Sequence, residues 1–326
     1  MFITKSQFVR DLKEKESVSS PFLVKYAALG TDKNGKGFMN LILMDKTGEL
    51  EARVWEDVSR YASVLVRDNF VHIEGKVQAY QGRKQVVINR AQALREDEVE
   101  VKDFVPAGTL DPEELYGKLK GYIASMEDPD YKALVESVFI HDEEVVSKMK
   151  RAPAAKSVHH AYPTGLLEHM VSITAILDSL AKHYGPIVNR DLLFVGGFFH
   201  DIGKIWELSY DRTTDYTNEG KLIGHLVMGA ELIEKKIQTL PNFPQEKRLL
   251  AKHMVLAHHG EYEYGSPKRP KVLEALIVHY IDDLDSKVNA IQKFIENDQN
   301  PGEWTLLNKM YGRYFFKTES NRKESF

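Results

Sequence analysis

The hydrophobic pattern of the sequence changes near residue 100, and this change divides the chain into two parts that must fold differently. Between about residues 20 and 95, short apolar segments, several of them alternating, are separated by "DKNGKG", "DKTG" and "QGRK". This pattern is typical of β-strands joined by turns. Beyond it, apolar residues recur at helical spacing as far as about residue 297. The length of 326 residues fits two domains of about 100–200 residues each.

The first part predicts a small barrel of five strands. The strands are expected within "PFLVKYAALG", "GFMNLILMDKTG", "ELEARVWED", "NFVHIEGKVQAYQG" and "RKQVVINRAQAL". A helix-like segment, "VSRYASVLV", follows the third strand. The oligonucleotide/oligosaccharide-binding (OB) fold is a five-stranded barrel with its helix between strands three and four. We therefore expect an all-β OB-fold domain that binds nucleic acid over residues 1–97.

The second part is predicted to be all-α. The acidic segment "REDEVEVKDFVPAG" is expected to be a linker, and the next segment begins with Asp111 as N-cap and Pro112 at the first helical position. We assign the linker and connecting helices to residues 98–150, and a helical bundle with a C-terminal tail to residues 151–326. Only helices and loops are expected up to about residue 297. The tail is basic and aromatic, and its end is expected to fray.

Composition excludes several classes of chemistry and location. The net charge of −4 gives no overall attraction for nucleic acid, so an anion-binding site must be local. The absence of cysteine excludes disulfides, thiolate zinc sites and cysteine nucleophiles. The N-terminus has no signal-peptide core, and the longest apolar run, Leu192–Phe199, is far shorter than the roughly 20 residues that span a bilayer. We expect a cytoplasmic protein with no membrane partner, and homo-oligomerisation is left open.

Histidine is concentrated in the second half of the chain. Of the twelve histidines, only His72 lies outside the segment from His141 to His279. The run "FVGGFFHDIGK" delivers His200 and Asp201 from an apolar helix, and such a buried pair is costly unless a charge such as a metal ion compensates it. Further candidate ligands lie on successive predicted helices or at their ends: His169, His225, His258, His259 and Asp282. Without cysteine, these imidazole and carboxylate groups suit Mn, Fe, Co, Ni, Zn or Mg.

The ordered set His169, His200–Asp201 and Asp282 resembles the pattern His…His-Asp…Asp of the HD superfamily of metal-dependent phosphohydrolases, over about residues 155–290. The resemblance implies that these residues hold one metal ion, and that His225, His258 and His259 hold a second, with Asp201 shared. It also implies that Asp201 is catalytic, and that Lys204 of "HDIGK" contacts the substrate phosphate. Where a trinuclear member has glutamate, four residues before His169, this chain has Gly165, which favours a metal pair.

Some polar residues near these motifs have several interpretations. In "YIDDLDSK" the resemblance aligns Asp282 as the ligand, whereas Asp283 is expected in solvent and Asp285 behind the ligands. For His253 and His279 we expect structural or supporting roles. The pair in "HHAY", His159 and His160, either contacts substrate or caps the following helix. Lys204 also has two interpretations: it contacts the substrate phosphate, or it is a solvated lysine without a functional role.

The predicted barrel offers the parts of a single-strand binding surface, in which basic groups hold the backbone and aromatic rings stack on bases. Candidate residues are Lys25, Lys36, Phe38, Arg53, Trp55, Lys76, Tyr80, Arg83 and Lys84, with Tyr61 as a further aromatic residue. In a small barrel about half of such aromatic residues belong to the core, and acidic neighbours weaken the basic surface.

The barrel followed by the histidine–aspartate domain resembles the YhaM family of bacterial 3′-to-5′ exoribonucleases. The segments "HHAYPTGLLEHMVSI", "HDIGK", "HYIDDLDSK" and "GEWTLLNKMYGRY" carry the resemblance, which extends over nearly the whole chain. It implies a manganese-dependent phosphodiesterase that releases nucleoside monophosphates from the 3′ ends of single-stranded RNA, with single-stranded DNA as a further substrate.

Two alternatives of other classes stay open at this point. One is an HD phosphohydrolase of small nucleotides, in which the barrel is a regulatory or oligomerisation module. The other is an RNA-binding protein without catalysis, in which the metal is structural. Salt-dependent affinity for single strands would argue against the first alternative, and hydrolysis of any phosphoester would argue against the second.

Overall fold

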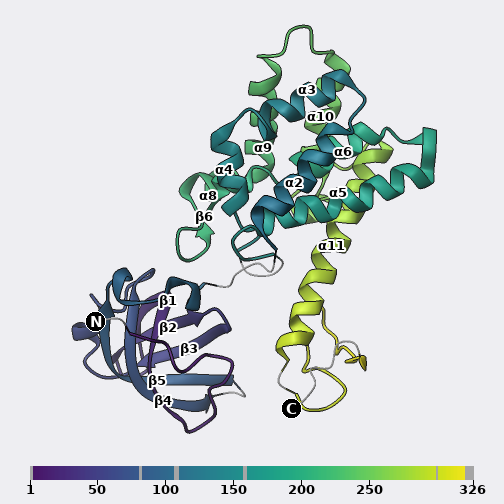
Figure 1. Ribbon diagram of the computed structural model, residues 1–326. Coiled ribbons are helices and arrows are strands. Elements are labelled where there is room, and N and C mark those ends of the chain that lie inside the picture. The colour runs from purple at the N-terminus through teal and green to yellow at the C-terminus, as the bar shows by residue number, and fades with distance from the viewer. Residues whose placement is uncertain (1–2, 81–82, 106–109, 157–159, 299, 320–326) are drawn as a thin grey trace. The chain divides into compact units, whose positions relative to one another are not determined.

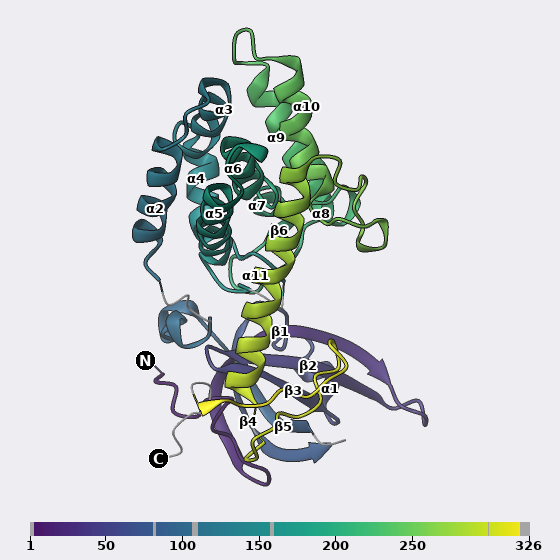
Figure 2. The same cartoon turned by 90° about the vertical axis from the view of Figure 1, so that its right-hand side faces the viewer.

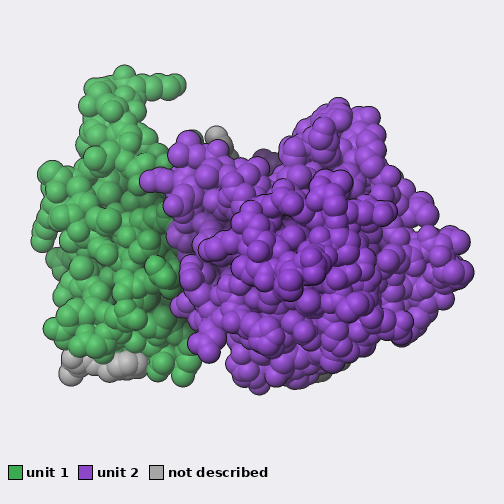
Figure 3. Space-filling view, turned by 90° about the horizontal axis from the view of Figure 1, so that it is seen from above, with its two compact units in different colours: residues 1–107, 211–213 green, residues 108–210, 214–326 purple. Residues whose placement is uncertain are grey.

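The computed structural model describes residues 3–80, 83–105, 110–156, 160–298 and 300–319. The chain divides into two compact units, coloured separately in Figure 3: residues 1–107 with 211–213, and residues 108–210 with 214–326. Figure 1 shows strands in the first unit and mainly helices in the second. The predicted fold class, a β-barrel followed by a helical domain, is therefore confirmed.

The first unit is a closed barrel in the strand order β1-β2-β3-β5-β4. Its strands are β1 Ser17–Thr31, β2 Gly37–Asp45, β3 Gly48–Val54, β4 Phe70–Tyr80 and β5 Arg83–Leu94. The pair β3–β5 is parallel and all other pairs are antiparallel. Alternation in β2 points Met39, Leu41 and Leu43 into the barrel, where they are buried. The residues between them are free to form an outer surface.

The helix predicted after the third strand is much shorter than its sequence pattern suggests. Helix α1 covers only Val58–Tyr61. The chain then turns, because the Asn69 side chain donates to the carbonyl of Val64 (3.1 Å) and β4 begins one residue later. Tyr61 is buried and its hydroxyl donates to the carbonyl of Asn89. The expectation that Tyr61 is available to a nucleic acid is therefore wrong, since the ring belongs to the barrel core.

The acidic segment after β5 is more ordered than a linker. It contains two single turns of 3₁₀ helix, Glu96–Glu98 and Val101–Asp103. Two apolar residues of this segment, Val99 and Phe104, are buried against the barrel, and the ring of Phe104 lies edge-on to Phe70 with 5.0 Å between centroids. These contacts hold the segment on the first unit as far as Phe104, because apolar burial outweighs the acidic character of the other residues.

A buried ion pair fastens the N-terminal segment to the barrel. The Lys5 ammonium donates to the carbonyl of Pro21 (2.6 Å), lies 3.2 Å from the Asp45 carboxylate and stands 3.5 Å from the centre of the Phe22 ring. Burial lowers the pKa of Lys5 to about 8. The Asp45 carboxylate is fully buried and also accepts from the backbone of Val9 (2.8 Å). Lys5 thus supplies the charge that an enclosed carboxylate needs.

Replacing Lys5 with Met should destabilise the protein by about 3–5 kcal/mol, because the change leaves Asp45 buried without its cation. The free energy of unfolding of the full-length protein in urea, followed by circular dichroism, measures this effect. Lys13→Met at an exposed position is the matched control, expected within about 0.5 kcal/mol of the wild type. Equal stability of the two variants would show that the ion pair is dispensable.

The second unit is built from helices α2 to α11. Their bounds are α2 Pro112–Ala124, α3 Pro129–Phe139, α4 Glu143–Arg151, α5 Gly165–Tyr184, α6 Arg190–Phe199, α7 Lys204–Glu207, α8 Asn218–Leu222, α9 His225–Ile237, α10 Gln245–Ala257 and α11 Leu273–Asn297. The predicted cap of α2 is confirmed, since the Asp111 carboxylate accepts from the backbone of Glu113 (3.1 Å). Figure 2 shows α5 and α6 in the interior, with α11 running along them.

Helix α6 is the centre of this unit. All residues from Asp191 to Phe199 are buried, which agrees with their nearly unbroken apolar sequence. Among the described residues, one departure from the all-α expectation follows it: Leu208–Ser209 (β6) pairs with Asp215–Tyr216 (β7). Strands of two residues are too short to leave a periodic pattern in the sequence. No helix in the described ranges is long and apolar enough to cross a membrane.

Candidate metal centre

The predicted ligands come from five helices, and all except Asp282 lie near a helix end. His169 lies in the first turns of α5, His200 and Asp201 directly follow α6, and His225 begins α9. His258 and His259 follow the last residue of α10, and Asp282 lies in the middle of α11. A helix end can direct a side chain towards another element without interrupting the packing of the helix. The helical core therefore positions the candidate ligands.

The first cluster contains His169, His200, Asp201 and Asp282, whose ligand atoms all lie within 4.8 Å of one another. The Nε2 atom of His169 lies 3.1 Å from Asp282 Oδ1 and 3.3 Å from His200 Nε2. The Oδ2 atom of Asp201 lies 3.7 Å from His169 Nε2 and 3.5 Å from His200 Nε2. Two nitrogen and two oxygen ligands thus face one small space.

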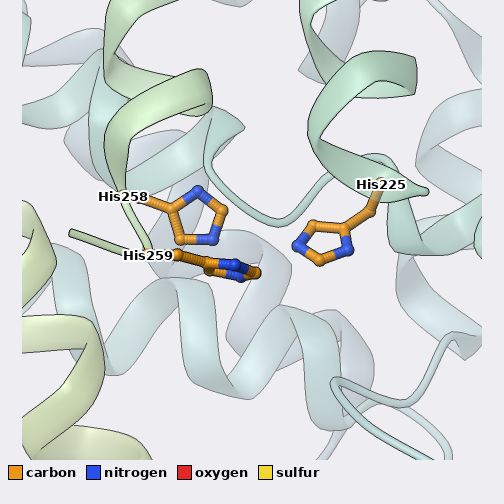
Figure 4. Close-up of side chains that lie close together, drawn as sticks. All are labelled: His225, His258 and His259. Carbon is orange, nitrogen blue, oxygen red and sulfur yellow. The ribbon is translucent and has the colours of Figure 1, made fainter. Parts of the chain in front are cut away.

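The second cluster contains His225, His258 and His259, again with ligand atoms within 4.8 Å. Figure 4 shows the three rings converging on one space, two from the end of α10 and one from the start of α9. The ring centroids of His258 and His259 are 4.4 Å apart, and His225 is 5.1 Å from His259. The Asp201 Oδ1 atom lies 3.5 Å from His225 Nε2 and 3.6 Å from His258 Nε2.

The Asp201 carboxylate therefore stands between the clusters, with one oxygen towards each. Among the described residues, its Oδ1 atom and the Nε2 atoms of His225 and His258 are buried without a hydrogen-bond partner. Buried polar atoms normally have partners, and converging atoms without any indicate a site for a bound ion. The donor set of imidazole and carboxylate fits divalent metal ions. The residues present thus fit a metal pair that shares Asp201.

The imidazole rings are held in one orientation by their Nδ1 atoms. His200 Nδ1 lies 3.0 Å from the carbonyl of Gly197, His258 Nδ1 lies 2.8 Å from that of Val255, and His259 Nδ1 lies 3.0 Å from that of Tyr264. A carbonyl only accepts, so each Nδ1 carries the hydrogen. Each Nε2 then presents a lone pair to the clusters, as metal binding requires.

In the remaining two histidines, Nδ1 faces a carboxylate instead of a backbone carbonyl. His169 Nδ1 lies 2.8 Å from Asp285 Oδ2, and His225 Nδ1 lies 2.9 Å from Glu207 Oε1. Asp285 therefore lies on the far side of the His169 ring from the first cluster. Glu207 was missed: it ends the four-residue helix α7, and no spacing rule connects it with His225.

Electrostatics differ sharply among the histidines. Burial lowers the pKa of His169, but its bonds to Asp282 and Asp285 raise the pKa to about 9. Burial lowers the pKa of His200 to about 4, and burial together with the charges of His258 and His225 lowers that of His259 to about 4. Near neutral pH the extra proton therefore resides on His169, beside Asp282 and Asp285, and a bound metal cation would take its place.

Lys204 lies inside the centre, beside Asp201. Its ammonium donates to Asp201 Oδ2 at 2.6 Å, and its side chain is only 12% exposed. Burial lowers the pKa of Lys204, but the charge of Asp201 raises it above its usual value. Burial also raises the pKa of Asp201, whereas Lys204 and His200 bring it well below the ordinary range. Both groups are therefore charged near neutral pH.

The other histidines and aspartates of the sequence predictions lie outside the clusters or behind them. Asp283 pairs with Lys287 at 2.7 Å on the outside of α11. His253 Nε2 accepts from the backbone of Lys271 (2.9 Å), and His279 Nδ1 donates to the carbonyl of His258 (2.8 Å).

The two histidines of "HHAY" were left open by the sequence. His160 is buried, with Nε2 at 3.4 Å from Asp285 Oδ2 and Nδ1 at 3.0 Å from the Tyr162 hydroxyl. It therefore packs behind His169 at the start of α5. His159 lies outside the described residues.

Two aromatic candidates of the barrel lie side by side, Phe38 on β2 and Trp55 directly after β3, whereas Tyr80 ends β4. The rings of Phe38 and Trp55 have centroids 5.1 Å apart, and the Arg53 guanidinium lies 6.0 Å from the centre of Phe38. Trp55 is 39% exposed and Tyr80 is 55% exposed, so both rings are available.

Strand register puts several basic candidates on the same outer face. Arg53 is opposite Val87, and Val87 is opposite Lys76 on the other side. Directly opposite residues point to one face of a sheet. Lys25 is paired with Glu49, and Arg83 lies 3.4 Å from Glu51, so neighbouring carboxylates neutralise part of the charge. The other predicted cations are exposed: Lys36, Lys76 and Lys84.

Comparisons with known proteins agree with this architecture. The HD domain family matches residues 166–287, and the OB-fold nucleic acid binding domain family matches residues 23–94. Fold and site thus define a two-domain protein of the HD class with an N-terminal OB-fold. A protein of Geobacillus sp. (strain WCH70) is 38% identical over 93% of this chain and 92% of its own, and one of Oceanobacillus iheyensis is 39% identical over 93% and 94%. Both are named 3′-5′ exoribonuclease YhaM, and the chain belongs to the YhaM family.

Replacing His258 with Ala should reduce the number of Mn²⁺ ions bound per chain from about two to about one, because the second cluster loses a nitrogen ligand while the first stays complete. Equilibrium dialysis with metal analysis measures the stoichiometry. His253→Ala on the same helix is the control and should keep both ions, since its ring bonds to the backbone of Lys271. Unchanged binding in the His258 variant would contradict the assignment of the second cluster.

Proposed function

We propose that this protein is a 3′-5′ exoribonuclease whose helical domain hydrolyses the last phosphodiester bond of single-stranded RNA and releases nucleoside monophosphates. The observation that carries the proposal is the Asp201 carboxylate, which faces two buried clusters of histidine and carboxylate ligands. Such a paired centre suits displacement at phosphorus. The membership in a family whose relatives are named 3′-5′ exoribonuclease supports RNA as the substrate.

The ligand atoms divide between the two ions according to the clusters. His169, His200, Asp201 and Asp282 would hold the first ion, and His225, His258, His259 and the second oxygen of Asp201 would hold the other. We propose Mn²⁺ as the working metal; Fe, Co, Ni, Zn and Mg accept the same donor types to differing degrees. When bound, the ions would polarise the phosphodiester and activate water for attack.

Lys204 is proposed to neutralise charge on the phosphoryl oxygens. Its ammonium now neutralises Asp201 at 2.6 Å. Cations that share Asp201 would take over this task, which would free the ammonium for an anionic substrate beside it. A fixed positive charge next to the reacting phosphorus stabilises the transition state more than the ground state, because negative charge builds up on the oxygens.

The barrel is proposed to hold the RNA strand near the helical domain. The neighbouring rings of Phe38 and Trp55, with the guanidinium of Arg53 beside Phe38, offer faces for bases and a charge for the backbone. Binding of this kind depends little on sequence, which suits an enzyme that degrades strands from the end. Single-stranded DNA has the same stacking faces and is a further ligand. Linking a capture surface to a catalytic centre raises the local concentration of strand ends.

Incubating the protein with 5′-labelled single-stranded RNA and Mn²⁺ should give a descending ladder of labelled products, and a chelator should abolish it. Asp201→Ala should reduce turnover by at least about 1,000-fold, because it removes the carboxylate common to both ions. Gel resolution by length measures the products. Asp283→Ala is the control: this residue pairs with Lys287 outside the clusters and should leave turnover unchanged.

Intact RNA with the wild-type protein would contradict the proposal. Hydrolysis of mononucleotides or cyclic nucleotides instead would assign the centre to a small-nucleotide phosphohydrolase. A metal-loaded protein that binds RNA but hydrolyses no phosphoester would be an RNA-binding protein with a structural metal.

Replacing both Phe38 and Trp55 with Ala should weaken single-stranded RNA binding by about 2–6 kcal/mol, since each stacked base contributes about 1–3 kcal/mol. Fluorescence anisotropy with a labelled oligonucleotide in the presence of a chelator measures affinity without cleavage. Val66→Ala, at an exposed apolar residue in the loop before β4, is the control. Equal affinity of the double variant and the control would exclude this face as the RNA surface.

A further inference from the structure

The two carboxylate–histidine pairs are distributed evenly between the clusters. His169, the partner of Asp285, belongs to the first cluster, and His225, the partner of Glu207, belongs to the second. The other three histidines donate from Nδ1 to backbone carbonyls. Each proposed ion thus has one histidine that is backed by a negative charge.

The Glu207 contact is built into the fold by several close approaches. The carboxylate is buried, and its Oε1 atom accepts from both the ring and the backbone N–H of His225, at 2.9 Å and 3.1 Å. A Cβ atom on Gly203 would lie 2.2 Å from the carbonyl oxygen of His225, and one on Gly220 would lie 2.2 Å from that of Glu207. Only glycine allows these backbone segments to meet, so two glycines fix both ends of the pair.

The Asp285 contact has its own supports. The Ser172 hydroxyl donates to Oδ1, and Oδ2 faces both His169 Nδ1 at 2.8 Å and His160 Nε2 at 3.4 Å. Helices α5 and α11 supply these groups apart from His160, which precedes α5, whereas the Glu207 pair lies between α7 and α9. Within the part of the chain that the structure describes, no hydrogen bond or ion pair joins the two carboxylates, so a change in one has no direct path to the other cluster.

We infer that Glu207 and Asp285 are positioning residues that control the affinity of different metal ions. Glu207 acts through His225 on the ion of the second cluster, and Asp285 acts through His169 on the ion of the first. A carboxylate behind a ligating imidazole fixes the ring and increases its basicity, and its loss typically weakens metal binding about 10–100-fold. The inference rests on the metal pair of the proposed function. It adds two residues, each of which sets how tightly one of the two metal ions is bound.

The test uses Glu207→Gln and Asp285→Asn, which remove the negative charge and keep the shape of the side chain. Mn²⁺ binding to the full-length metal-free protein, without RNA, is followed by the electron paramagnetic resonance signal of free Mn²⁺. Each variant should weaken one of the two ions about 10–100-fold and leave the other within about twofold. Glu274→Gln is the matched control, because this buried carboxylate accepts from the backbone of Asn189 away from the clusters and should bind both ions as the wild type does.

Combination with His258→Ala identifies which ion is affected. In that background only the first ion remains, so adding Asp285→Asn should weaken it about 10–100-fold and adding Glu207→Gln should not. Thermal unfolding of each metal-free variant separates a loss of fold from a loss of affinity.

Three results would overturn the inference. Both variants could weaken the same ion, both could bind Mn²⁺ as the wild type does, or the wild type could bind no Mn²⁺. Failure of the proposed function is distinguishable from these results, since a wild-type protein that binds two ions and leaves RNA intact would lose its proposed activity while the assignment of Glu207 and Asp285 stands.

Discussion

The Asp201 carboxylate between two histidine clusters is the interaction on which the rest of the helical domain depends. It is buried, carries negative charge and directs one oxygen to each cluster, so it needs positive charge on both sides. The structure supplies Lys204 at one oxygen, and around the other it leaves imidazole nitrogens that have no hydrogen-bond partner among the described residues. This requirement explains why the ends of several helices converge on one residue of the chain.

Under the proposed function, the helical unit hydrolyses the strand end and the barrel binds the strand. The helical unit holds a rigid centre, in which backbone carbonyls and carboxylates fix each imidazole through Nδ1. The barrel offers exposed rings and charges that are partly neutralised by acidic neighbours. We therefore expect that mutations in the helical unit alter catalysis and that mutations on the barrel surface alter RNA binding.

Sequence patterns predicted the elements wherever a long periodic segment decides the structure. The strands of the barrel, the cap at Asp111 and the buried helix before His200 follow from local rules. The same local rules failed where contacts of a few residues decide where an element ends. The helix after β3 ends at Tyr61, and the Asn69 side chain donates to the carbonyl of Val64 in the turn that follows it. The acidic segment stays on the barrel because Phe104 is buried. Single long-range contacts of this kind have no periodicity to detect.

The sequence by itself determined the two fold classes and the order of the histidines and aspartates, because residue type and order along the chain carry that information. The choice of Asp282 as a ligand came from the resemblance and stays a prediction. Only the tertiary structure decided which oxygen of Asp201 faces each cluster, that Lys204 neutralises Asp201, and that Glu207 stands behind His225. Spacing along a helix fixes the direction of a side chain relative to its own axis. It does not fix which atom of another helix that side chain meets, since this depends on how helices distant in sequence pack together.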